Sequence, residues 1–145
     1  MRQVRIPLFP AFVIVLVLGC AAVQAPSKGD VSDDVKRIFI GTWEGEHVDQ
    51  EGNLLRTWIQ RRSEDGTYAI TFVHYSGKGI RKSRQRGKWW IEGDRFYEIA
   101  PSAMEDPDVY QFEILNENKI CFKSITTDYE FVDRRTQDLR DVTFI

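Results

Sequence analysis

The sequence has 145 residues, which is the length of one ordinary domain. It is 42% hydrophobic and 12% aromatic, and it contains 10 glycines, 5 prolines and 2 cysteines. These proportions exclude a disordered chain, a collagen-like chain and a disulfide-rich scaffold. With 20 basic and 22 acidic residues the net charge is −2, so charge gives no argument for a nucleic-acid partner, and we predict none.

The first residues are typical of an export signal. Arg2 and Arg5 precede an unbroken apolar run at residues 11–18. A membrane-spanning helix needs about 20 apolar residues, so this run fits the core of a signal peptide better. Residues 23–25, Val-Gln-Ala, fit ordinary signal peptidase, but Pro26 follows directly, and a proline after the cleaved bond is usually refused.

A second candidate cleavage site lies at the end of the apolar run. Residues 17–20, Val-Leu-Gly-Cys, resemble a bacterial lipobox, in which the cysteine receives lipid. The resemblance implies a lipoprotein signal peptide at 1–19, an acylated Cys20 and a tether to residue 31. Because Ala21 follows Cys20, the mature chain resembles proteins sorted to the outer membrane, facing the periplasm. The expected location is therefore the bacterial cell envelope, with secretion as the alternative.

Residues 32–145 form the predicted folded domain, which begins with a short helix. Ser32 is a candidate helix cap, and Val35, Ile38 and Phe39 share one helical face. This pattern predicts a helix of one or two turns.

The rest of the domain shows the two-residue alternation of β-strands. In 67–75 and 109–116, apolar side chains recur at every second position. Turn-forming sequences such as 64–67 and 92–94 separate the segments. This pattern predicts an all-β fold, a small antiparallel up-and-down β-barrel with a short N-terminal helix, and a two-sheet sandwich is the alternative. The predicted strands are 40–48, 55–62, 67–75, 84–91, 95–99, 109–116, 120–125 and 129–133, with a further candidate at 142–144.

Gly41, Thr42 and Trp43 open the first predicted strand, directly after the helix. A Gly-x-Trp in this context resembles the lipocalins and the calycin-like families around them. The resemblance implies that Trp43 closes the base of the barrel, and that Arg134 or Arg135 stacks over it. Residues 127–129, Thr-Asp-Tyr, resemble a second lipocalin signature. In that family a full strand separates this signature from the arginine, whereas here only 130–133 do.

Aromatic side chains inside such a barrel either fill it or line a cup. A cup would bury most of an apolar ligand, whereas a solid core would leave no cavity. Both alternatives remain open from the sequence. The candidate ligand-binding residues are Tyr68, Phe72, His74, Trp90, Tyr110, Phe112 and Phe122.

Residues 78–88 contain six basic side chains and no acidic one. We expect a basic hairpin at the barrel rim that faces anionic groups. The alternative is a solvated hairpin whose charges pair with Glu44, Glu46 or Glu98 across the sheet. The residues of this basic segment are Lys78, Arg81, Lys82, Arg84, Arg86 and Lys88.

Motifs for catalysis or metal binding are missing from the sequence. His47 and His74 lie far apart, and the chain has no nucleophile elbow and no phosphate-binding glycine loop. We therefore expect no enzyme activity, no metal and no cofactor. The predicted function is binding of an apolar or amphiphilic, lipid-like small molecule by a membrane-anchored lipoprotein. The alternative is a protein-interaction module with a solid core, either an envelope assembly factor or a hydrolase inhibitor, whose partner the sequence does not identify.

Overall fold

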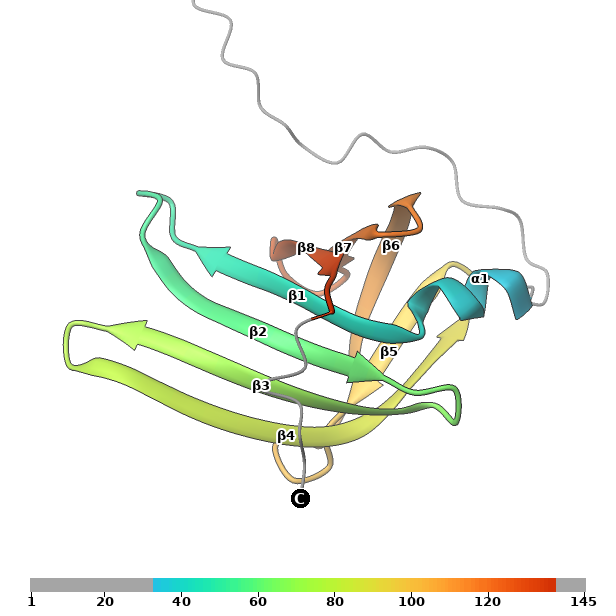
Figure 1. The fold of residues 1–145 in the computed structure, drawn as a ribbon, viewed down its shortest axis with the longest axis horizontal. Helices are drawn as coiled ribbons and strands as arrows, with labels where there is room; N and C mark the ends of the chain where they lie inside the picture. The colour runs from blue at the N-terminus through green and yellow to red at the C-terminus, as the bar shows by residue number, and fades with distance from the viewer. Residues whose placement is uncertain (1–32, 138–145) are drawn as a thin grey trace, which may run out of the picture.

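The computed structural model describes residues 33–137, in which one short helix precedes eight strands (Figure 1). Each strand pairs antiparallel with the next, and β8 pairs with β1, so the sheet closes into a barrel. The predicted up-and-down β-barrel with a short N-terminal helix is confirmed, and the sandwich is excluded. The elements are α1 (Asp33–Phe39), β1 (Gly41–Val48), β2 (Leu54–Arg62), β3 (Thr67–Ser76), β4 (Gly79–Glu92), β5 (Arg95–Ile99), β6 (Asp108–Asn116), β7 (Lys119–Ser124) and β8 (Glu130–Arg135).

The largest difference from the predicted elements is in β4. The sequence predicts a strand at 84–91, but β4 begins at Gly79 and runs to Glu92. Most of the basic segment is therefore strand and not loop. The β3–β4 hairpin is long, and its tip lies far from α1 (Figure 1). The predicted cap Ser32 and the strand candidate at 142–144 lie outside the described residues.

The barrel interior contains the apolar face predicted for residues 67–75. Across the β2–β3 pair, Trp58 lies opposite Phe72, and Tyr68 lies further along the same face of β3. Trp58 and Tyr68 belong to the buried core, and Phe72 packs against it. Side chains alternate between the two faces of a strand, so this register directs every second residue of β2 and β3 inward.

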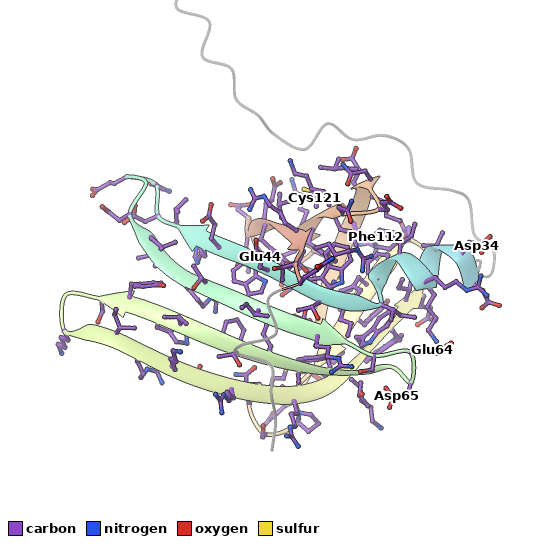
Figure 2. The ribbon with its side chains drawn as sticks, viewed as in Figure 1. Asp34, Glu44, Glu64, Asp65, Phe112 and Cys121 are labelled. Atoms are coloured by element: carbon purple, nitrogen blue, oxygen red, sulfur yellow. The ribbon has the colours of Figure 1, made fainter. Side chains whose placement is uncertain are left out.

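The base of the barrel is filled by the end of α1. Phe39 is fully buried and contacts rings from four strands, with centroid distances of 6.3 Å to Trp89, 5.5 Å to Phe96, 5.0 Å to Phe112 and 6.1 Å to Phe122. Phe112 points toward α1 (Figure 2). The Trp43 indole donates a hydrogen bond of 2.9 Å to the Phe39 carbonyl oxygen, which holds the helix end on the first strand. This half of the barrel has a solid aromatic core.

The prediction that Trp90 faces the interior is wrong. Trp89 is the inward residue, with 1% exposure, and it packs on Phe39 and Phe96. Trp90 is 36% exposed on the outer face and stacks on Tyr97 with a centroid distance of 5.1 Å. Adjacent residues of a strand point to opposite faces, so only one of two consecutive tryptophans can enter the barrel.

Gly87 tests the packing of the inner wall. A Cβ at this position would overlap the carbonyl oxygen of Ile99 and would lie 2.7 Å from Cε1 of Tyr68. We expect Gly87→Ala to lower the free energy of unfolding by about 1–3 kcal/mol, because backbone must move to admit the methyl group. The matched control is Gly77→Ala, where nothing lies within 4 Å of the added Cβ. Its change should stay within about 0.5 kcal/mol in urea unfolding. Equal stability of the two variants would contradict the packing described.

Candidate functional site

The half of the barrel away from α1 encloses a cavity of about 180 Å³. Six strands contribute to its wall, together with the loops between β5 and β6 and between β7 and β8. Apolar and polar side chains share that wall, so it is not a purely apolar cup. The lining residues are Arg56, Trp58, Gln60, Tyr68, Ile70, Phe72, Gln85, Glu98, Met104, Asp108, Tyr110, Tyr129 and Phe131.

Three of the seven predicted ligand-binding residues line this cavity, namely Tyr68, Phe72 and Tyr110. Phe112 and Phe122 lie in the solid base against Phe39, and they do not reach the cavity. The placement predicted for these two side chains, and for Trp90 on the outer face, is therefore wrong.

His74 lies on the inner face of β3 beyond the cavity wall. Its Nε2 lies 3.0 Å from the Ser83 hydroxyl oxygen, and its ring lies 5.8 Å from that of Phe72. Partial burial, with Arg81 and Arg56 nearby, lowers the pKa of His74. A neutral imidazole is thus favoured at this position.

Arg56 occupies the mouth side of the cavity. Its guanidinium lies over the Phe72 ring, 4.9 Å from the centroid, and over Trp58, at 5.8 Å. Its Nη2 donates a hydrogen bond of 3.2 Å to the Tyr129 hydroxyl, while its buried Nε has no protein partner. One cationic donor group is therefore held by aromatic side chains at the mouth.

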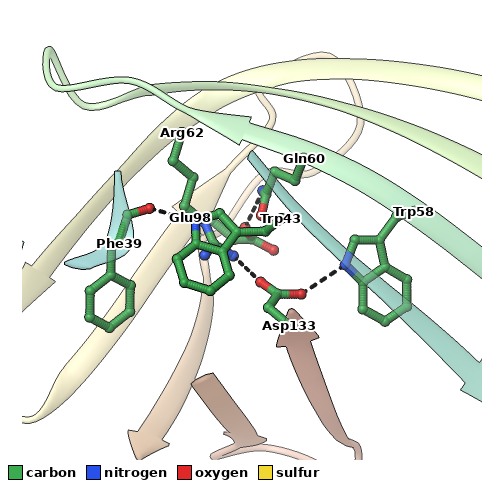
Figure 3. Close-up of polar contacts among 7 residues, drawn as sticks. All are labelled: Phe39, Trp43, Trp58, Gln60, Arg62, Glu98 and Asp133. Atoms are coloured by element: carbon green, nitrogen blue, oxygen red, sulfur yellow. Dashed lines mark hydrogen bonds and ion pairs between the residues drawn. The ribbon is translucent and has the colours of Figure 1, made fainter. Parts of the chain in front are cut away.

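Glu98 contributes the carboxylate of the cavity floor. The Gln60 amide, on the far side of the interior, donates a hydrogen bond of 2.9 Å to Glu98 Oε2 (Figure 3). Burial raises the pKa of Glu98, and the Arg62 charge and the Gln60 hydrogen bond oppose that increase. Since β2 and β5 are not neighbouring strands, this hydrogen bond crosses the barrel and forms the bottom of the cavity.

Tyr68 and Tyr110 are neutral wall residues. Burial is the main cause that raises the pKa of both phenols, and the nearby carboxylates of Glu98 and Asp108 raise it further. Both phenols therefore keep their protons, and the Tyr110 hydroxyl is hydrogen-bonded to Asp108, while Tyr68 can serve as a hydrogen-bond donor toward the cavity.

Below the floor lies a buried ion pair between Arg62 of β2 and Asp133 of β8. Their side chains are 1% and 0% exposed. The second carboxylate oxygen of Asp133 accepts a hydrogen bond of 2.9 Å from the Trp58 indole (Figure 3). The Arg62 guanidinium also lies 4.8 Å from the Phe96 ring centroid. No local sequence signal identifies this pair, because its partners are 71 residues apart.

Of the two arginines predicted to stack over Trp43, Arg135 does so. Its guanidinium lies 4.4 Å from the ring centroid. It also donates hydrogen bonds of 2.8 and 2.9 Å to the carbonyl oxygens of Ile38 and Ile40. Arg134 instead lies on the outer face, where its register partner in β1 is Glu44. The late basic residue therefore connects β8 to the segment between α1 and β1.

The basic segment runs along the outer face of β4 and does not gather at the rim. Lys82, Arg84, Arg86 and Lys88 share the outward face with Trp90, while Lys78, Arg81 and Lys82 lie nearest the hairpin tip. The prediction of a rim patch is wrong for Arg84, Arg86 and Lys88. Pairing with Glu98 is excluded because this carboxylate is inside the barrel. Glu44 and Glu46 lie on β1, which β2 and β3 separate from β4.

Residues 33–137 contain no group of three or more His, Cys, Asp or Glu side chains placed so that they could hold a metal ion. The same residues include no helix of the length and apolarity needed to cross a membrane. Cys121 of β7 is 2% exposed. The other cysteine of the sequence, Cys20, lies outside the described residues.

A scan against protein-family models finds no match, and a search of curated proteins finds none. Among solved structures, the chain is similar to a de novo designed fluorescence-activating β-barrel. The TM-score is 0.45 and the sequence identity is 19%, over 71% of this chain and 98% of the designed chain. At this level of similarity, neither a family nor a ligand for this chain follows from the comparison.

The contribution of the buried ion pair can be tested by comparing the stability lost when it is broken with the stability lost when an exposed ion pair is broken. Asp133→Asn removes the charge that neutralises Arg62, and we expect a loss of about 3–5 kcal/mol in the free energy of unfolding. Asp94→Asn breaks the exposed pair with Arg95, whose atoms are 3.3 Å apart, and should cost less than about 1 kcal/mol. Urea unfolding measures both values. If Asp133→Asn were no more costly than Asp94→Asn, the Arg62 guanidinium would not depend on this carboxylate.

Proposed function

We propose that the chain is a lipid-anchored cell-envelope protein that binds a small amphiphilic molecule inside its barrel. The observation that carries the binding proposal is the cavity, because the mouth half of the interior is hollow while the base half is packed solid. The lining combines aromatic rings, which bury apolar surface, with fixed polar groups, which orient a ligand.

The size of the cavity limits the ligand. Typical pockets for drug-sized molecules have volumes of roughly 300–1,000 Å³. The present cavity, at about 180 Å³, is smaller. It fits one ring with a short polar arm, and it does not enclose a long acyl chain. The lipid-like ligand expected from the sequence is thus narrowed to a small amphiphile.

Blocking the cavity tests this proposal. Gln85 lines it from β4. We expect Gln85→Trp to abolish binding of phenethyl alcohol, an uncharged probe of suitable size, in ligand-observed NMR, because the indole fills the space. Arg84→Trp adds the same side chain to the exposed outer face of β4 and should leave binding unchanged. Retained binding in Gln85→Trp, or no binding by the unsubstituted protein, would contradict the cavity proposal.

The alternative function, a protein-interaction module, is favoured by one specific observation. The exposed Trp90 stacks on Tyr97 on the outer face, beside the basic side chains of β4. Aromatic residues and arginine are enriched in protein interfaces. The two substitutions above also separate these functions, since a partner on this face would respond to Arg84→Trp and not to Gln85→Trp.

The membrane anchor is proposed because residues 17–20 resemble a lipobox. Acylation requires a free thiol on Cys20. An acylated Cys20 uses its sulfur in a thioether, so it cannot also form a disulfide with Cys121. We expect the mature protein from a bacterial host to carry acyl mass on Cys20 and to sediment with membranes. Cys20→Ser should abolish both results, whereas Cys121→Ser should leave the acyl mass in place. Recovery of a Cys20–Cys121 disulfide peptide from the mature protein would overturn the anchor.

A further inference from the structure

The charges inside the barrel do not cancel around the cavity. Arg62 and Asp133 form an ion pair below the floor, with both side chains buried, while Nε and Nη1 of Arg62 have no hydrogen-bond partner. The ionisable groups that line the cavity and normally carry charge at neutral pH are then one cation, Arg56, and two carboxylates, Glu98 and Asp108. When all three are ionised, the lining carries one net negative charge.

The two carboxylates lie side by side on one wall. Glu98 of β5 and Asp108 of β6 are directly opposite each other in the strand register, and both side chains line the cavity. Carboxylates on directly opposed residues of neighbouring strands repel each other unless a cation or a proton lies between them. Glu98 accepts a hydrogen bond from the neutral Gln60 amide, and Asp108 accepts one from the neutral Tyr110 phenol. The Arg62 charge also acts on Glu98, but Arg62 is already paired with Asp133.

Arg56 does not neutralise this wall. Its guanidinium is stacked over Phe72 and donates to Tyr129, at the β2–β8 side of the mouth. A hydrogen bond between an ammonium group and a carboxylate is stronger than one between neutral groups.

We propose that the ligand of this cavity is a small organic cation, an aryl- or alkylammonium ion, whose ammonium group binds between Glu98 and Asp108. This inference rests on the proposed binding function and specifies its ligand class. It reverses the anionic head group expected from the basic segment, because those basic side chains lie mainly on the outer face and not at the cavity.

The pH dependence of binding has a defined sign. Burial raises the pKa of Glu98, so lowering the pH protonates this group before an ordinary glutamate. A cation binds the ionised form, and its affinity should therefore rise with pH through the titration of Glu98. The other charged or titratable groups around Glu98 are Arg56 and Arg62 of β2, Tyr68 of β3, Asp108 and Tyr110 of β6, Tyr129 before β8, and Asp133 of β8.

Three probes that differ only in their polar group test the inference. Phenethylammonium, phenethyl alcohol and phenylacetate are titrated into the full chain, and dissociation constants are measured by ligand-observed NMR. We expect phenethylammonium to bind about tenfold more tightly than the alcohol at pH 8, and to lose this preference in Glu98→Gln. Glu92→Gln, an exposed position at the far end of β4, makes the same charge change and should retain the preference.

The outcomes separate the inference from the proposed function. If the alcohol binds and Gln85→Trp blocks it, but phenethylammonium has no advantage, the cavity binds ligands and the cation inference fails. Tightest binding of phenylacetate would make Arg56 the anchor and would also overturn the inference. If none of the three probes binds, both proposals fail. A preference for phenethylammonium that persists in Glu98→Gln would remove Glu98 from the site.

Discussion

Closure of the barrel depends on side chains that reach across its seam. The strand register between β1 and β8 covers two residue pairs, Trp43 with Arg135 and Glu44 with Arg134, and one further backbone hydrogen bond of 2.9 Å joins Thr136 N to the Thr42 carbonyl oxygen. So short a ladder leaves most backbone N–H and C=O groups at the β1–β8 seam without partners on the opposite strand. Side-chain contacts are therefore needed to hold the two strands together. Arg135 supplies one contact by stacking on Trp43 and donating to two carbonyl oxygens before β1. Asp133 supplies the other, because it binds the Trp58 indole and Arg62, both from β2.

The contact made by Asp133 lies between two different halves of the interior. Below Asp133, α1 inserts Phe39 among packed rings from β4 to β7. Above it, the Gln60–Glu98 hydrogen bond crosses the barrel and forms the floor of the cavity. A buried ion pair is a weak source of net stability, but removal of one partner is expensive. Its position at the boundary between core and cavity therefore fixes the geometry of the floor more than it adds to stability.

The parts that the sequence predicts correctly are those governed by local rules. Two-residue alternation identifies the face of Tyr68, Ile70 and Phe72, and turn residues separate the strands. The same alternation already places Trp90 on the face of Arg84 and Lys88, so its assignment to the cavity contradicted the pattern itself. Trp89, on the other face, was the candidate consistent with that pattern.

The polar interior is the part that local rules could not predict. Every second residue of β2 faces inward, and three of these, Arg56, Gln60 and Arg62, are polar. The alternation rule assigns the hydrophobic face of a strand to the interior, so it cannot decide which face of β2 points inward. Such side chains can be buried only with partners, and those partners come from residues 38 to 73 positions away. Until the topology is known, nothing near β2 in the sequence identifies them.

Under the proposed binding function, this polar interior disfavours a plain hydrocarbon as the ligand of the cavity. A hydrocarbon would displace water from Glu98 and from the buried Nε of Arg56 without replacing the lost hydrogen bonds. Each polar group left unsatisfied in this way costs about 1–3 kcal/mol, and more when the group is charged. That cost offsets the gain from burying a small apolar molecule, about 25 cal/mol for each Å² of surface. Amphiphilic molecules avoid the penalty, because their polar group replaces the displaced water while their apolar part contacts Trp58, Ile70 and Phe72.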